Sequence, residues 1–186
     1  MNFEEKNITK QNNEIAQQTN NLTLKERLQL KKSNRVLILD ISASMNEEIE
    51  PGRSKITALR EIVNSIPGNP PTIAFNNTAI EIDKSNIPNP RGGTMMTNAL
   101  ILAKSKGFKN ILMITDGDAS DKRLTLLEAE GLNIQIMYVG CGPRPKFLDE
   151  LGSSCTTEDL RSKELGTKIQ LLLGSGGEVK SKTIIL

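Results

Sequence analysis

The chain has 186 residues, of which 37% are apolar and 25% charged, and its formal net charge is +2. This is enough for one domain with a full hydrophobic core, and too little for two comfortable ones. The near-neutral charge and the 3% of aromatic residues exclude the basic surface and base-stacking platforms of a nucleic-acid binder. Histidine is absent, which excludes Ser-His-Asp and Cys-His catalysis and zinc sites that use imidazole. Cys141 and Cys155 have no metal-ligand spacing and make no disulfide framework.

Residues 1–32 are predicted to form a polar N-terminal arm with a short helix. Residues 7–21 are rich in Asn and Gln and lack periodicity. Residues 23–26 have the form of a capping box, and leucines follow on one side of the expected helix. The beginning of the chain lacks the apolar core of a signal peptide, and no later segment is long enough to span a bilayer. We therefore expect a cytoplasmic protein without a membrane span.

Residues 33–174 are predicted to form the globular domain. Residues 35–41 (RVLILDI) are almost continuously apolar, which suits a strand buried on both faces of a parallel sheet. Residues 54–66 have apolar side chains at helical spacing, and Pro67 and Gly68 end this helix. Further along, we expect strands at 72–76 and 79–83 joined by a tight hairpin, a helix at 95–106, a strand at 110–115, a helix at 121–130, a strand at 133–139, and short helices at 147–151 and 162–173.

This alternation of strands and helices predicts an α/β fold with a doubly wound, Rossmann-like sheet. We expect six mostly parallel strands, one antiparallel edge strand, and helices on both faces. Residues 175–186 are predicted to be a C-terminal tail, although 178–186 would also suit an added edge strand. In such folds ligands bind beyond the carboxyl ends of the strands, where the strand order reverses. The strands at 35–41 and 110–115 flank that point.

Polar side chains follow the first of these two strands. In an extended backbone alternate side chains point the same way, so Asp40, Ser42 and Ser44 are expected to share one side. By the same alternation, Ile41 and Ala43 are expected to face the packed interior. The sequence thus predicts one carboxylate and two hydroxyls at this strand end.

Two other loops add further oxygen groups. Asp116 follows the strand at 110–115, and Gly92-Gly93-Thr94 opens a helix, where the glycines let the backbone approach closely and leave the Thr94 hydroxyl free. Carboxylates and hydroxyls are hard ligands of the kind that Mg²⁺ or Mn²⁺ prefers, and two carboxylates are too few for a dedicated Ca²⁺ cage. A close carboxylate pair is costly without a cation, because like charges raise each other's pKa. The pattern therefore indicates a divalent-cation site.

The pattern resembles the metal-ion-dependent adhesion site of the von Willebrand factor type A family, over roughly residues 35–173. The resemblance is carried by Asp-x-Ser-x-Ser, a distant Thr and a later Asp, which correspond here to Asp40, Ser42, Ser44, Thr94 and Asp116. It implies that the hydroxyls bind the cation directly or through water and that the aspartates act largely through water. It also implies that a Glu or Asp of a partner protein completes the coordination. The expected function is a non-enzymatic, cation-dependent protein-binding module, of the kind that intracellular relatives use in multiprotein assemblies.

Two alternatives remain at this stage. A haloacid dehalogenase-like phosphatase also places an Asp after its first strand, and residues 117–121 (GDASD) vaguely resemble its later acidic motif. Such enzymes generally carry a second Asp, the general acid, where this chain has Ser42, and a serine cannot transfer that proton at neutral pH. A metal-free scaffold is disfavoured by the intact ligand set. Asp118 and Asp121 are interpreted as complements to a helix dipole, and Thr97 as a core or capping residue.

Overall fold

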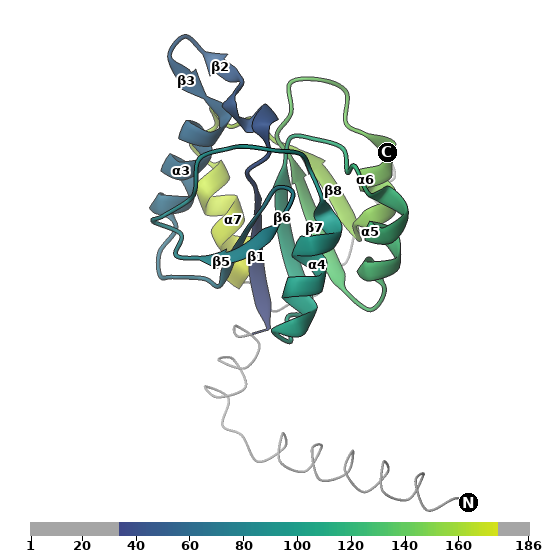
Figure 1. Ribbon diagram of the computed structural model, residues 1–186. Coiled ribbons are helices and arrows are strands. Elements are labelled where there is room, and N and C mark those ends of the chain that lie inside the picture. The colour runs from purple at the N-terminus through teal and green to yellow at the C-terminus, as the bar shows by residue number, and fades with distance from the viewer. Residues whose placement is uncertain (1–33, 175–186) are drawn as a thin grey trace, which may run out of the picture. The chain divides into compact units, whose positions relative to one another are not determined.

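A six-stranded sheet with the order β5-β4-β1-β6-β7-β8 runs through the centre of the domain (Figure 1). It is seen in a computed structural model that describes residues 34–174. The predicted arm at 1–32 and the predicted tail at 175–186 lie outside the described residues, as does the alternative that 178–186 form a strand.

Strand β1 is the centre of the sheet. Four of its six residues are apolar and fully buried, as expected for a strand covered on both faces. All neighbouring pairs are parallel except β4 with β5, which is antiparallel and lies at one edge. The strands are β1 (Arg35–Asp40), β4 (Thr72–Phe75), β5 (Ala79–Ile82), β6 (Asn110–Thr115), β7 (Asn133–Tyr138) and β8 (Ser154–Thr157). The predicted α/β sheet is therefore confirmed.

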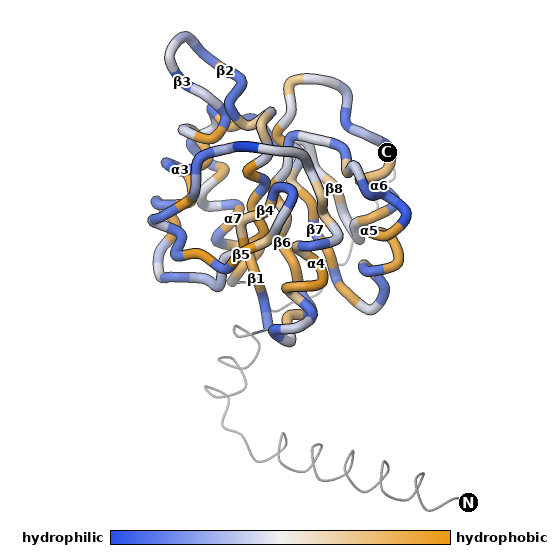
Figure 2. The backbone as a smooth tube through the Cα atoms, viewed as in Figure 1, coloured by the Kyte–Doolittle hydropathy of each residue, from blue (hydrophilic) through white to orange (hydrophobic). Residues whose placement is uncertain are grey.

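Helices cover both faces of this sheet (Figure 1). Leu37 and Leu39 pack with α3 (Lys55–Ser65) and α7 (Leu165–Gly174) on one face. Val36 and Ile38, which alternate with them along β1, point to the other face. That face is covered by α4 (Met96–Ser105), α5 (Lys122–Ala129) and α6 (Lys146–Leu151). Figure 2 shows the hydrophobic residues gathered along the central strands between the two helix layers.

The expected elements are present, with ends shifted by a few residues, but the sequence reading missed three short strands. β8 is the sixth strand, and its residues Ser-Cys-Thr-Thr are too short and polar a run to be recognised as a strand. A small hairpin, β2 (Glu48–Glu50) with β3 (Arg53–Ser54), also precedes α3. It turns at Gly52, whose φ of 75° is accessible to glycine at no steric cost.

The backbone beyond β1 differs from the prediction in a second way. It does not stay extended, but forms the 3-10 helix η1 (Ala43–Asn46) directly after Ser42. Ala43 is exposed, so the expectation that it faces the interior is wrong. Met45 is fully buried instead, because a tight helical turn replaces the strand alternation.

Within residues 34–174, none of the helices is long and apolar enough to cross a membrane.

The burial of Met45 suggests a test of how firmly η1 is anchored. Replacing Met45 by Ala should lower the free energy of unfolding by about 2–5 kcal/mol, because it leaves a cavity under the turn. Met45→Leu preserves volume and should lower it by less than about 1.5 kcal/mol. Urea denaturation followed by circular dichroism measures both. A Met45→Ala variant as stable as the wild type would show that the core does not hold η1.

Candidate metal centre

The predicted site lies at the carboxyl ends of β1 and β6. From β1 the chain passes to β4 on one side, and from β6 it passes to β7 on the other. The two strands therefore flank the point where the strand order reverses, which is the usual ligand position in doubly wound sheets. Asp40 is the last residue of β1, and Asp116 is the first residue after β6.

Ser42, Ser44 and Asp116 form a continuous hydrogen-bonded row. The Ser44 hydroxyl donates to Oδ1 of Asp116 over 2.8 Å, and the hydroxyl oxygens of Ser42 and Ser44 are 3.0 Å apart. Because the single proton of Ser44 is used toward Asp116, Ser42 is the donor in the second bond. The sequence predicts that the side chains of Ser42 and Ser44 lie together, and in the structure they do. They meet through the turn of η1, however, and not through strand alternation.

Asp40 lies beneath this row with no exposed surface. Its Oδ1 accepts the Ser42 backbone N–H at 2.8 Å, and its Oδ2 accepts the Thr115 hydroxyl at 2.6 Å. Burial raises the pKa of Asp40 to about 6 and the Asp116 charge adds to this, although the hydrogen bonds from Thr115 and Ser42 oppose it. Asp40 therefore connects the loop that carries Ser42 to Thr115 at the end of β6.

Thr94 comes from a third loop and lies beside the row without bonding to it. Its backbone carbonyl accepts the Ser120 N–H at 2.9 Å, and its hydroxyl oxygen is 3.6 Å from the position that a Cβ on Gly117 would take. Within residues 34–174 the Thr94 hydroxyl has no hydrogen-bond partner, so it is free to bind a ligand. In the preceding residues, Gly92 has a φ of 72°, which glycine adopts at no steric cost, and the Gly93 N–H donates to Oδ1 of Asn77 at 2.7 Å.

Lys55 is part of the site and was not predicted. Its side chain is 3% exposed, and its ammonium donates to Oδ2 of Asp116 at 2.7 Å and to Oε2 of Glu47 at 2.5 Å. Burial lowers the pKa of Lys55, but the bonds to Asp116 and Glu47 outweigh burial and hold the pKa above the ordinary lysine value. Lys55 therefore compensates the charge of Asp116, and the closeness of two carboxylates does not by itself require a metal.

Sequence reasoning could have found Lys55 from one anomaly. It is the first residue of α3, where the helix dipole disfavours a cation, so a nearby acidic partner for a lysine there is favourable. Thr115 gave no comparable signal, because a buried β-branched residue at the end of a strand is ordinary. Its hydroxyl is recognisable as a partner of Asp40 only from the pairing of β1 with β6.

The donor set fits a small divalent cation. It consists of three hydroxyls and two carboxylates at adjoining loops, and all the donors are hard oxygen ligands. Residues 34–174 contain no cluster of three or more His, Cys, Asp or Glu side chains that could hold a metal ion. The site therefore lacks the charge of a dedicated Ca²⁺ cage, and Mg²⁺ or Mn²⁺ suits it better.

The neighbouring acidic residues make contacts within the fold and outside the donor row. Oδ2 of Asp121 accepts the Thr97 backbone N–H at 3.1 Å at the beginning of α4, which caps that helix. The Thr97 hydroxyl is buried and lies 3.0 Å from the Thr125 hydroxyl. Asp118 forms an exposed ion pair with Lys122. None of these side chains bonds to the Ser42–Ser44–Asp116 row in the described part of the chain.

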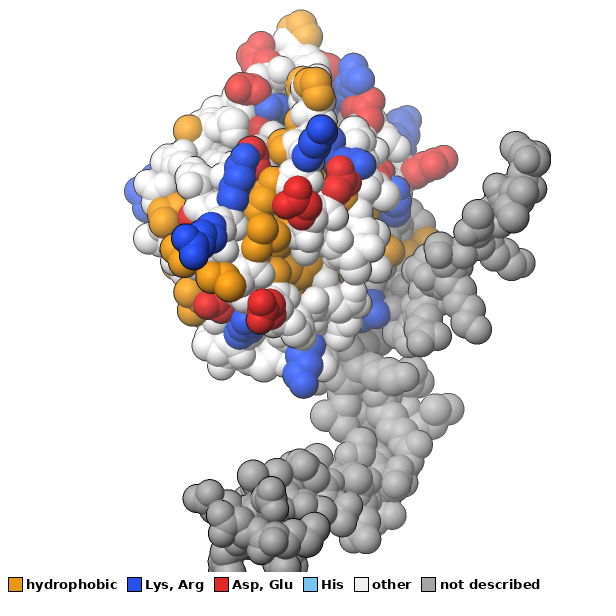
Figure 3. Space-filling model, turned by 90° about the vertical axis from the view of Figure 1, so that its right-hand side faces the viewer, with side chains coloured by type: hydrophobic (Ala, Val, Ile, Leu, Met, Phe, Trp, Pro, Cys, Tyr) orange, Lys and Arg blue, Asp and Glu red, His pale blue; other side chains and the backbone are white. Residues whose placement is uncertain are grey.

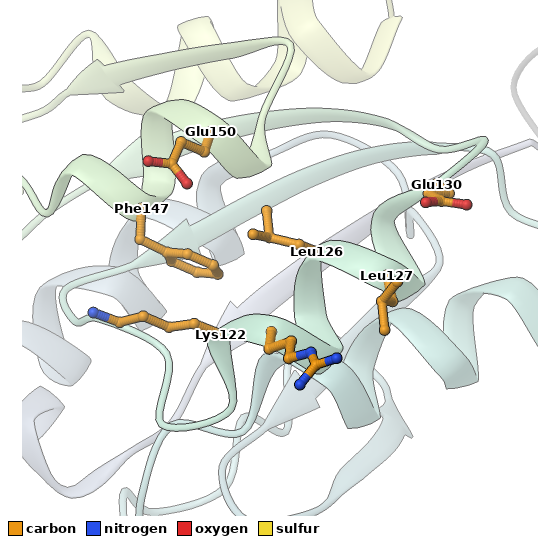
Figure 4. Close-up of a pocket in the computed structure, with 7 residues that line it drawn as sticks. Lys122, Leu126, Leu127, Glu130, Phe147 and Glu150 are labelled. Atoms are coloured by element: carbon orange, nitrogen blue, oxygen red, sulfur yellow. The ribbon is translucent and has the colours of Figure 1, made fainter.

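A surface groove lies elsewhere, between α5 and α6. It has a volume of about 640 Å³ and an apolar floor that includes Leu126 and Phe147 (Figure 4). Figure 3 shows this face, on which apolar side chains gather among charged ones. None of the five predicted site residues lines the groove.

No protein-family model matches the sequence, and a search of curated proteins finds no match. Among solved structures, the manganese-loaded TRAP protein of Plasmodium vivax is similar, with a TM-score of 0.53, 18% identity, and coverage of 77% of this chain and 72% of that chain. An aerotolerance-related membrane protein from Bacteroides fragilis, with multiple mutations to serines, has a TM-score of 0.51, 16% identity, and coverage of 75% and 97%. Similarity at this identity shows the fold alone, and it agrees with the doubly wound α/β fold expected from the sequence.

The raised pKa of Asp40 predicts a pH dependence of stability in the absence of metal. The folded-state pKa rises from 3.8 to about 6, so between these values the folded protein binds more protons than the unfolded chain. Stability should therefore fall as pH rises from about 4 to above 6, by on the order of 2–3 kcal/mol. Urea unfolding in EDTA at pH 4.5 and 6.5 measures the fall. It should be much smaller in Asp40→Asn, and an equal fall in that variant would assign it to other groups.

Proposed function

We propose that this protein is a divalent-cation-dependent protein-binding module with a metal-ion-dependent adhesion site. One observation carries the proposal: the hydrogen-bonded row of Ser42, Ser44 and Asp116 at the β1–β6 junction, with Asp40 bracing it from below. The three ligand oxygens, each within hydrogen-bonding distance of the next, can turn together toward one small cation. The manganese in the similar Plasmodium protein also supports a divalent ion.

In this proposal Asp40, Ser42, Ser44, Thr94 and Asp116 hold Mg²⁺ or Mn²⁺. The bound ion supplies a positive centre that attracts a carboxylate. Asp40 acts by orientation, because its two oxygens are already bonded to Ser42 and Thr115. Thr94 contributes a hydroxyl that is not engaged elsewhere in the described residues. With three neutral hydroxyls in the set, a divalent ion keeps residual positive charge for an external ligand.

The proposed ligand is a Glu or Asp side chain of a partner protein, within an intracellular assembly. A carboxylate is the simplest protein group that satisfies a hard cation with residual positive charge. Loops surround the site, and loops on a rigid sheet commonly supply the specificity of a binding module. The geometry of β1 and β6 keeps the metal ligands fixed while the loop sequences decide which partner fits.

We further propose that the protein is not an enzyme. The burial of Asp40 supports this, because a carboxylate nucleophile needs an accessible oxygen, whereas both oxygens of Asp40 are occupied and the residue is 0% exposed. Ser42 stands where a phosphatase of the haloacid dehalogenase type has its general acid, and its hydroxyl cannot replace a carboxylic acid in that role.

The first test of the proposal is metal binding. Calorimetric titration with Mn²⁺ should give one equivalent per chain, and Asp116→Ala should abolish the binding because it removes the charged ligand. Asp118→Ala is the matched control, since it removes a half-exposed carboxylate two residues away that lies outside the donor row. Unchanged Mn²⁺ binding in both Asp40→Ala and Asp116→Ala would refute the assignment.

The second test concerns catalysis. The protein should not hydrolyse para-nitrophenyl phosphate in the presence of Mg²⁺, because Asp40 is enclosed and no general acid follows it. Release of nitrophenolate is measured by its absorbance, with the EDTA-treated protein as the blank. Mg²⁺-dependent turnover that disappears in Asp40→Asn would favour the phosphatase instead.

A further inference from the structure

Asp116 is shared between the proposed metal ligands and a buried lysine. Its Oδ1 accepts the Ser44 hydroxyl at 2.8 Å, and its Oδ2 accepts the Lys55 ammonium at 2.7 Å. The exposed fractions of the two side chains in this ion pair are 0% for Asp116 and 3% for Lys55. The pair is therefore almost completely removed from water, and the attraction within it is only weakly screened.

A divalent ion at the serines would bring a second cation to the same carboxylate. One negative charge cannot neutralise both an ammonium and a divalent ion, and two cations held near each other in a poorly solvated site repel strongly. Asp40 adds a second negative charge near the ion, but its oxygens accept hydrogen bonds from Ser42 and Thr115 and not from Lys55. Asp116 is therefore the carboxylate that both cations would use. Either the ion binds weakly or the ammonium gives up Asp116.

The small hairpin provides a second acceptor for the ammonium. Glu47 immediately precedes β2, Lys55 immediately follows β3, and the Lys55 backbone N–H donates to the Glu47 carbonyl at 2.9 Å. The Glu47 carboxylate lies 2.5 Å from the ammonium, and its side chain is 64% exposed. Lys55 can therefore leave Asp116 and keep a charged partner at the edge of the solvent.

We propose that Lys55 is an internal cation that competes with the divalent ion for Asp116, with Glu47 as the acceptor that retains the ammonium when the ion binds. This inference rests on the proposed metal site. The centre then has two forms, one in which Lys55 pairs with Asp116 and one in which the divalent ion does. Lys55 sets the ion concentration at which the second form replaces the first.

A purely structural role accounts less well for this lysine. A buried ion pair contributes little net stability compared with apolar residues of similar volume. The position is also electrostatically unfavourable for a cation, since Lys55 begins α3 and lies at the positive end of the helix dipole. Its ammonium is nevertheless brought onto the one carboxylate that the ion would use.

The test is Mn²⁺ affinity in Lys55→Met, measured by calorimetry and by electron paramagnetic resonance of free Mn²⁺ after stripping with EDTA. Affinity should rise on the order of tenfold or more, because the competing charge is gone. Lys122→Met is the matched control: it removes a cation that pairs with Asp118 near the site, and it should change affinity by no more than about twofold, as expected for an exposed pair. Lys55→Gln keeps a hydrogen-bond donor without the charge, so it should show the same rise and protects the test against misfolding.

Glu47→Gln distinguishes the competition from a general charge effect. It should weaken Mn²⁺ binding several-fold in the wild-type background, because the displaced ammonium loses its acceptor. It should have at most a much smaller effect when Lys55 is already Met. In EDTA, Lys55→Met should also melt at a lower temperature than the wild type, and Mn²⁺ should raise its melting temperature by more than it raises that of the wild type.

The outcomes separate the two proposals. If Lys55→Met and Lys55→Gln bind Mn²⁺ as the wild type does, or more weakly, Lys55 does not compete and only the present inference is overturned. If neither the wild type nor these variants bind Mn²⁺, the proposed metal site fails and the inference fails with it. Binding that appears only when Lys55 is replaced supports both.

Discussion

Two carboxylates are buried at neighbouring strand ends, and each must be compensated for the loss of water. The arrangement of the site follows from this constraint, because an uncompensated buried charge is strongly destabilising. Asp40 is stabilised by two neutral donors, the Ser42 backbone and the Thr115 hydroxyl, and its pKa is raised so that protonation becomes accessible. Asp116 is stabilised by the ammonium of Lys55. The two buried carboxylates are therefore stabilised in different ways, and only Asp116 is paired with a full opposite charge.

Asp40 and Asp116 therefore have different roles within the proposed centre. Asp40 is fully buried and is bonded to the Ser42 backbone and the Thr115 hydroxyl, so it acts as a fixed support for the loop that carries the serines. Asp116 is bonded at one oxygen to the Ser44 hydroxyl and at the other to the Lys55 ammonium. In the two-form centre proposed above, binding of the ion changes the partners of Asp116 and Lys55, while the β1–β6 framework stays in place.

The parts of the molecule that depend on local patterns could be predicted from the sequence. The apolar run of β1 and the periodic helix α3 are long enough to be recognised alone, and the fold determines which strand ends meet. Ser44 was placed correctly for an incorrect reason, since η1 and not an extended strand brings it to Ser42. Lys55 was missed because its position depends on the β2–β3 hairpin, whose strands of three and two residues carry no hydrophobic pattern. β8 was missed because its pairing with β7 is decided by tertiary contacts, not by the propensity of four small polar residues.

The two edges of the sheet limit the ways in which this domain can associate. β5 and β8 have four residues each, and both are flanked by turns. Glu81, on β5, pairs with Lys106, and β8 consists of Ser, Cys and two Thr residues. β8 is a short polar edge, and Glu81 places a charge on the short β5, whose Ile80 is 48% exposed. Short edges that carry charged or polar side chains are poor templates for β-augmentation and for edge-to-edge aggregation. In the proposed binding module, recognition therefore falls to the loops and helix surfaces, so the partner would need no extended segment and could present a single side chain from any fold.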